Sequence, residues 1–215
     1  MAVAQEKSQE LIDSILEIAA KQFAEKGFSG ARVDEIAHEA GVNKATMYYH
    51  IGNKQALYEQ IFIEPLEATL ADVRGQVAQT TGAEARLRVY IKCLAQNMTS
   101  RYGYFPAVMM REVVSGAARI PERAMRTMCD VQLILREIIS DGVKTGSFRT
   151  VNPFMVHMLI MGSLSIYTTG GPMRQRMTAL FNDYQVQNSQ LENQFMLEEI
   201  VDMIVYSVLN GGVKK

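Results

Sequence analysis

The chain has 215 residues, which is enough to bury a sizeable core and to form one or two compact domains. Hydrophobic residues make up 48% and charged residues 21%, a composition typical of a globular protein. The formal net charge of −1 excludes a chain that attracts nucleic acid through its overall charge, so any such surface must be local.

The cysteines and the N-terminus bear on the compartment. Cys93 and Cys129 lie far apart in apolar helical contexts and match neither metal-ligand spacing nor a small disulfide scaffold. We expect both to be buried free thiols in a reducing environment. The first ten residues carry no apolar run of signal-peptide length, and no segment approaches the ~18 apolar residues of a membrane helix. The sequence thus predicts a cytoplasmic protein with no membrane partner, metal or cofactor.

Two helices are predicted first. Residues 8–26 form a helix that Gly27 stops, because apolar side chains recur there at three- and four-residue spacing. These side chains are Ile12, Ile15, Leu16, Ala19 and Phe23. A short second helix follows over 33–40, with Asp34 and Glu35 in its first turn, where the helix dipole favours negative charge.

Two further helices lie beyond a break at Gly41. Asn43 is a good N-cap for a third short helix over 44–50. A long fourth helix is predicted from about residue 54 toward residue 80, bending near Pro65.

The rest of the chain is also predicted to be helical. The expected segments are 83–101, 106–116, 121–142, 152–169 and 195–210. Gly142 follows the last apolar position of its helix, Asn152 and Pro153 open the next, and Gly170-Gly171-Pro172 closes it. The stripe of the final helix consists of Leu197, Val201, Ile204 and Val208. Between the last two helices the polar stretch 182–194 is predicted to be a loop, and the whole fold is predicted to be all-α.

The second and third helices fit a helix-turn-helix. Ile36, Ala37 and Met47 would face inward, while Gly41 lets the backbone turn sharply. The outward arc of the third helix then holds polar and aromatic side chains, namely Lys44, Ala45, Thr46, Tyr48, Tyr49 and His50. A helix in the major groove meets bases with its N-terminal residues, and polar side chains around it contact phosphates.

The distribution of carboxylates supports this interpretation. No acidic residue occurs between Glu39 and Glu59, whereas Lys44 and Lys54 supply positive charge. A carboxylate in this segment would face a phosphate, so its absence suits a DNA-binding surface. Residues 1–54 nevertheless hold six Lys or Arg and eight Asp or Glu. Spacing alone therefore leaves open that the tyrosines are ordinary packing residues.

Two other classes of protein compete with a DNA-binding regulator. An enzyme would need catalytic residues, but the sequence has no Gly-rich phosphate loop, no nucleophile elbow, no H-E-x-x-H motif and no metal cluster. A helical adaptor that binds protein is the second alternative. Neither explains the acid-free segment, and we predict that the chain has no catalytic residue.

The run "FAEKGFSGARVDEIAHEAGVNKATMYYHIGNKQALY" extends the argument to a family. It contains, in order, Gly27-Phe28, Ile36-Ala37, Ala40-Gly41-Val42, Thr46-Met47-Tyr48, and Asn53-Lys54 with Leu57. In these elements it resembles the DNA-binding segment of the tetracycline-repressor (TetR) family of bacterial regulators. The chain departs from that pattern at Ala31-Arg32, where the family usually has a capping Thr or Ser, at Ala45 in place of a common Gly, and at Gly52.

The resemblance implies an N-terminal three-helix helix-turn-helix domain over 1–54 and a larger helical ligand-binding and dimerisation domain over 55–215. It implies a ligand-responsive regulator, most often a repressor, that binds double-stranded palindromic operator DNA as a homodimer and is released by a small effector, here expected to be largely apolar. The predicted DNA-binding residues are Arg32, Asn43, Lys44, Ala45, Thr46, Tyr48, Tyr49, His50 and Lys54.

The remaining domain has no transferable motif. The helices near 152–169 and 195–210 are apolar over more than one face, as a four-helix bundle between two protomers requires. Fourteen methionines are many for this length, and they suit a pocket of irregular apolar shape or, alternatively, only fill core and interface. The predicted pocket residues are Met98, Tyr102, Phe105, Met109, Glu112, Met128, His157, Met158 and Met161.

Overall fold

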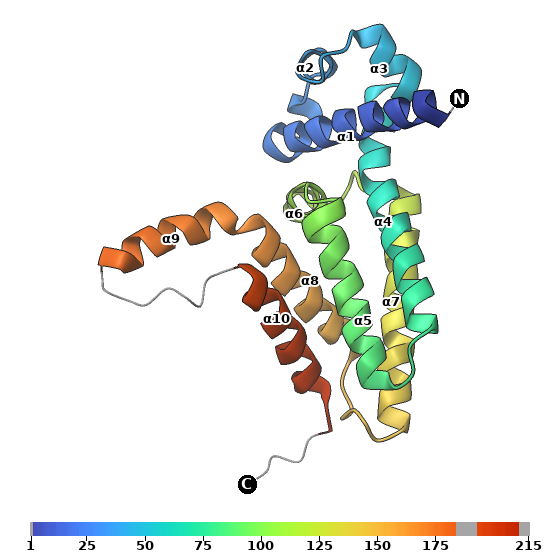
Figure 1. The fold of residues 1–215 in the computed structure, drawn as a ribbon, viewed down its shortest axis with the longest axis vertical. Coiled ribbons are helices and arrows are strands. Elements are labelled where there is room, and N and C mark those ends of the chain that lie inside the picture. The colour runs from blue at the N-terminus through green and yellow to red at the C-terminus, as the bar shows by residue number, and fades with distance from the viewer. Residues whose placement is uncertain (1, 184–192, 211–215) are drawn as a thin grey trace. The chain divides into compact units, whose positions relative to one another are not determined.

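A computed structural model describes residues 2–183 and 193–210, which are almost entirely helical (Figure 1). In chain order the helices are α1 (Ala2–Gly30), α2 (Val33–Glu39), α3 (Lys44–Ile51), α4 (Lys54–Ala78), α5 (Ala83–Gln96), the π-helical turn η1 (Asn97–Arg101), α6 (Phe105–Val114), α7 (Glu122–Lys144), α8 (Pro153–Thr169), α9 (Gly171–Asp183) and α10 (Asn193–Val208). Over these described residues the only β-type pairing is an isolated bridge between Phe148 and Leu209. The all-α prediction is confirmed.

The chain forms two compact units. The first unit consists of Met1–Leu66 and Tyr104–Met125, and the second consists of Glu67–Gly103 and Arg126–Lys215. Lys54, the last residue of the predicted DNA-binding domain, is the first residue of α4. The boundary after Lys54 between the DNA-binding domain and the ligand-binding domain stays a prediction.

Local chemistry sets the helix ends in the first unit. Gly27 has φ +72° inside α1, so the helical backbone breaks at the predicted residue although a further short turn continues to Gly30. Arg32 provides α2 with no side-chain cap, as the missing Thr or Ser predicts. Gly41 has φ +67°, and Asn43 caps α3 by accepting a hydrogen bond from the Thr46 amide at 2.7 Å. The predictions for these four residues are confirmed.

The core of the first unit is aromatic. Tyr58 on α4 meets Phe23 and Phe28 edge-on, each with ring centroids 4.9 Å away. Phe62 lies 5.1 Å from Tyr58 and 6.0 Å from Phe105 at the start of α6. These contacts, together with the packing of α6 against α1, join the two sequence segments of the unit.

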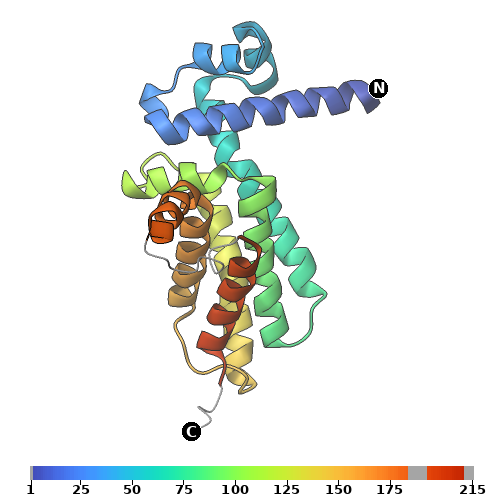
Figure 2. The same ribbon diagram turned by 60° about the vertical axis from the view of Figure 1, so that its left-hand side comes forward.

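The core of the second unit is aliphatic. In it α10 packs against α5 and α8 (Figure 2). α8 also contacts η1. The predicted stripe of the last helix is confirmed, because Val201, Ile204 and Val208 are buried and Leu197 packs against the same cluster. Met98 belongs to this cluster and Met161 lies against it. The searched residues contain no helix with the length and hydropathy that crossing a membrane requires.

Three sequence-based expectations for the second unit are wrong. Cys129 is exposed, because it lies off the face of α7 that buries Val131 and Leu135; only Cys93 is a buried thiol. Gly142 does not end its helix, since α7 continues to Lys144 and Phe148 folds back onto the glycine.

The third correction concerns the segment after α8. Gly170 does end α8, but the glycines and proline also open α9, because proline is tolerated in a first helical turn. The ends of the predicted loop 182–194 belong to α9 and α10, and its middle lies outside the described residues.

Candidate nucleic-acid interface

Helices α2 and α3 form the predicted helix-turn-helix. Ile36, Ala37 and Met47 are at most 3% exposed, so one face of each helix is fixed inside the first unit. The Val42 amide donates to the Ala37 carbonyl at 3.0 Å and closes the turn at Gly41. Met47 and Ile51, four residues apart, are the buried residues of α3, so the positions before and between them turn toward the other side, as the helical period requires.

The outward arc of α3 is accessible. Tyr49 is 86% exposed and Tyr48 is 42% exposed, so both are among the exposed large hydrophobic side chains of the protein. The Tyr49 ring contacts the half-buried His50 edge-on at 5.1 Å. Asn43, Lys44 and Ala45 are exposed at the N-terminal end of the helix. Two phenol hydroxyls and the amino end of α3 therefore face solvent together.

Thr46 is less accessible than the tyrosines of this arc. Its side chain is half-buried, and its hydroxyl donates to Asn43 Oδ1 at 3.0 Å, the oxygen that also caps the helix. Asn43 thus positions the first turn of α3 in addition to being exposed.

Lys44 is engaged by an acidic residue that the sequence segment itself lacks. Its Nζ lies 2.8 Å from Oδ1 of Asp34, which reaches across from the first turn of α2. The hydrogen bond and charge of Lys44 lower the pKa of Asp34, and the same pair raises the pKa of Lys44. The segment is acid-free in sequence, but the surface around α3 is not. Sequence spacing missed this pair because its members lie on two different helices.

The neighbouring carboxylate engages two further cations. Glu35 Oε2 lies 2.6 Å from Lys26 Nζ, and Glu35 Oε1 lies 4.0 Å from Nε of Arg32, a predicted phosphate contact. The hydrogen bond from Lys26 and, to a smaller extent, the charge of Lys26 lower the pKa of the Glu35 carboxyl. The first turn of α2 therefore neutralises several of the cations around the helix-turn-helix.

Lys54 is held differently. Its Nζ lies 4.8 Å from the centroid of the Phe28 ring, a cation–π contact rather than an ion pair. Lys54 follows Asn53, whose Oδ1 accepts from the Ala56 amide at 2.9 Å and caps α4. A partly exposed ammonium group is thereby fixed at the start of that helix.

The predicted pocket residues are divided between the units. Phe105, Met109 and Glu112 belong to the first unit, where Glu112 is buried and accepts from the Tyr58 hydroxyl at 2.5 Å. The other six lie in the second unit: Met98 and Tyr102 are buried, Met128, His157 and Met161 are half-buried, and Met158 is 51% exposed. As a pocket, the set remains a prediction.

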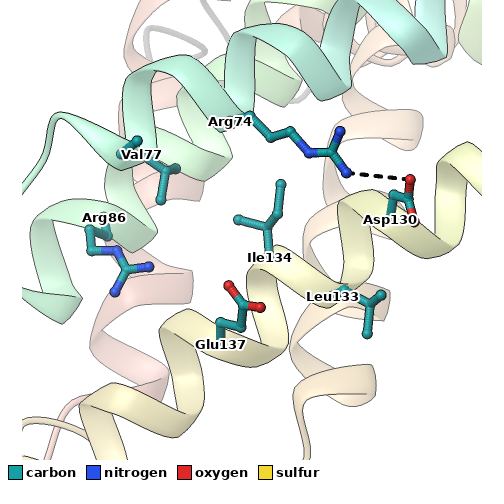
Figure 3. A pocket seen from close by; sticks show the side chains of 8 residues that line it. Arg74, Val77, Arg86, Asp130, Leu133, Ile134 and Glu137 are labelled. Carbon is teal, nitrogen blue, oxygen red and sulfur yellow. Dashed lines mark hydrogen bonds and ion pairs between the residues drawn. The ribbon is translucent and has the colours of Figure 1, made fainter.

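A separate groove of about 330 Å³ opens in the second unit (Figure 3). Its apolar floor includes Val77 and Ile134, and Arg74 reaches Asp130 at 3.4 Å along one side. Arg86 and the Glu137 carboxylate lie at the other end. None of the predicted pocket residues lines this groove. Among the described residues no group of three His, Cys, Asp or Glu side chains is placed to hold a metal ion.

A helix-turn-helix with an accessible second helix, joined to a separate helical unit, defines a DNA-binding transcription regulator. Comparison with known families agrees: residues 15–61 match the model "Bacterial regulatory proteins, tetR family", and residues 80–181 match "Tetracyclin repressor-like, C-terminal domain". The chain belongs to the TetR family, and the resemblance drawn from its N-terminal motifs is confirmed. Its family consists of transcription regulators and not of enzymes.

Two related regulators match the chain over different lengths. It is 26% identical over 184 residues to the HTH-type transcriptional regulator RutR of Escherichia coli K12, covering 84% of each chain. It is 42% identical over 48 residues to IcaR of Staphylococcus aureus Newman, a negative regulator of the biofilm operon icaADBC; this match covers 22% of the chain and 26% of IcaR.

Solved structures share the fold. The ketosteroid transcriptional regulator KstR2 of Mycobacterium tuberculosis aligns with a TM-score of 0.70 at 17% identity, covering 94% of this chain and 95% of KstR2. The regulator FadR of Bacillus subtilis, in complex with stearoyl-CoA, aligns with a TM-score of 0.62 at 18% identity, covering 89% of this chain and 96% of FadR.

Proposed function

We propose that this regulator is a repressor that binds a palindromic operator as a homodimer and releases it when a small, largely apolar effector binds. The observation that carries the DNA-binding part is the accessible arc of α3. Tyr48, Tyr49 and Lys44 are exposed there, although the helix is anchored by a fully buried Met47. Helices placed in this way enter the major groove with their N-terminal residues.

Apolar side chains on two helices of the second unit support the homodimer. α8 and α10 expose Phe154, Met155, Met158, Leu159, Ile166, Met203 and Tyr206, all at least 50% accessible in the single chain. Exposed apolar faces of this extent mark interaction sites. We assign them to a two-fold contact between copies, which would present two recognition helices to half-sites about 34–36 Å apart.

The effector is assigned to the second unit on weaker grounds. Met98 belongs to its core and Met161 lies against that core, and thioether side chains adapt to apolar ligands of irregular shape. Two proteins of like fold, the ketosteroid regulator KstR2 and FadR in complex with stearoyl-CoA, are associated with molecules that carry a large apolar part, a steroid and a stearoyl chain. We propose that the regulator acts in the cytoplasm without a cofactor.

The first test is operator binding against salt concentration. Fluorescence anisotropy with DNA from the region upstream of the protein's own gene should give an affinity that falls steeply with salt, by a log–log slope of about −0.9 for each phosphate neutralised. Binding that is absent or insensitive to salt would favour a protein-binding adaptor instead.

Two pairs of variants test the predicted roles. Tyr49→Phe and Lys54→Ala should weaken binding to all sequences alike, because they contact the backbone. Thr46→Ala and Lys44→Met should also change the preference between operators, because these residues lie at the end of α3 that meets bases. Equal loss of preference in all four variants would contradict the assignment.

The dimer has its own test. Met203→Glu puts a charge into an apolar surface that is 72% exposed in the single chain. We expect the variant to sediment as a monomer and to lose most of its operator affinity, while its circular dichroism spectrum is unchanged. A variant that stays dimeric would move the interface away from α10.

A further inference from the structure

We propose that Asp34 is an intramolecular competitor of DNA for Lys44, so that this residue pair sets how tightly the regulator holds its operator. The inference rests on the proposed DNA-binding function. It adds a regulatory role for Asp34, whose carboxylate is negatively charged like the DNA with which it competes. Asp34 belongs to the helix before the recognition helix, outside the acid-free segment.

The geometry puts the two ligands of Lys44 in direct competition. Lys44 is the first residue of α3, and its Nζ is 2.8 Å from Asp34 Oδ1. The Lys44 side chain is 48% exposed and that of Asp34 is 60% exposed, so approaching DNA has access to the ammonium group. The end of α3 that carries Lys44 is also the end that enters a groove.

The charges make the pair a barrier to DNA binding. If Lys44 turns to DNA, the Asp34 carboxylate loses its partner; if the carboxylate stays close to Lys44, it repels the phosphates of the bound duplex. Ion pairs between exposed side chains are weak, so DNA can still open this one. The pair therefore reduces affinity without abolishing binding.

Lys54 gives an internal comparison. It is the other lysine among the predicted DNA contacts, and it lies against the Phe28 ring instead of a carboxylate. A phosphate can bind Lys54 without displacing an anion. Of these two lysines, only Lys44 therefore meets the barrier, next to the turn of the helix-turn-helix.

The test is the substitution Asp34→Asn, which keeps the shape of the side chain and removes its charge. The dimeric protein should bind its operator about two- to fivefold more tightly for each protomer, the range expected when one exposed ion pair is removed. The salt dependence should steepen by up to about one unit of log–log slope per protomer. In the unmodified protein the carboxylate that Lys44 leaves takes up a cation when DNA binds, and the asparagine of the variant does not.

Two controls separate this effect from a change in net charge. Asp13→Asn removes the same charge from an exposed aspartate of α1 whose carboxylate accepts from Gln9 at 2.8 Å, and it should leave affinity nearly unchanged. In a Lys44→Met background, Asp34→Asn should lose most of its effect, since a double-mutant cycle isolates the coupling of the two residues.

The outcomes distinguish the inference from the proposed function. If the unmodified protein binds operator but Asp34→Asn binds equally or more weakly, the competition is refuted; weaker binding would mean that Asp34 holds Lys44 in position for DNA. An equal gain from Asp34→Asn with and without Lys44 refutes it as well. If the unmodified protein does not bind DNA at all, the proposed function itself fails.

Discussion

Replacement of Gly142 by alanine should destabilise the second unit. An ideal Cβ at this position would lie 2.0 Å from Cδ2 of Phe148, whose side chain is 2% exposed. Carbon atoms in contact lie about 3.5–4.0 Å apart, so the ring or the helix would have to move by roughly 1.5 Å. Phe148 belongs to the aliphatic core cluster, which leaves the ring little room to move.

Two opposing effects decide the magnitude. Forcing extra atoms into a packed core costs about 1–3 kcal/mol, whereas replacing a helical glycine by alanine gains about 0.5–1 kcal/mol. Because the obstacle is a buried aromatic ring, we take the upper part of the first range and expect a net loss of about 2 kcal/mol. For a chain of this size that lowers Tm by about 4–8 °C.

The assay is urea unfolding followed by circular dichroism, at one protein concentration for all variants. Gly75→Ala is the matched control, because Gly75 is an exposed glycine of α4 with nothing within 4 Å of its ideal Cβ. It should stabilise the protein by about 0.5–1 kcal/mol. If Gly142→Ala proves as stable as Gly75→Ala, the ring does not occupy the space in front of Gly142.

The two remaining predictions concern titratable side chains. Burial, aided by the charge of Asp72, raises the pKa of the Cys93 thiol to about 11, so at pH 8 its thiolate fraction is about a hundredfold below that of a free thiol. A thiol reagent should thus modify the exposed Cys129 quickly and Cys93 only after denaturation; two fast thiols would contradict the burial. Burial also lowers the pKa of His157 below 6.5, so the unfolded chain binds this proton more readily and the free energy of unfolding should fall as pH drops below 6.5. His157→Gln should reduce that loss, and an unchanged pH profile would refute it.

Local signals predicted much of this fold. Asn43 and Asn152 cap their helices through bonds to amides only two or three residues away, and Gly41 turns the chain by its own backbone angle. Such interactions depend only on a few neighbouring residues, so the local sequence is enough to predict them. The same holds for Met47, whose position on the inward face follows from the helical period alone.

Features that depend on distant partners could not be predicted in this way. Gly142 resembles a helix stop until Phe148 folds back onto it, and the exposure of Cys129 depends on which face of α7 meets the core. The glycine–proline sequence after α8 is compatible with both an end and a start, so α9 was missed. The contact of Asp34 with Lys44 crosses a turn, and an inspection of α3 alone does not reveal it.

Arg111 has a consequence for how this protein is made. Its guanidinium donates to the Ala24 and Glu25 carbonyls at 3.0 and 3.1 Å, and thereby supplies bonds that the end of α1 cannot make with its own backbone. Glu112 beside it is likewise the acceptor for Tyr58. When the ribosome has released only residues 1–66, the first segment of the first unit is therefore exposed before Arg111 and Glu112, which bond to it, have been synthesised. A fragment that ends at residue 66 should therefore be incompletely folded near the end of α1. A chain that extends through residue 125 contains both segments of the first unit.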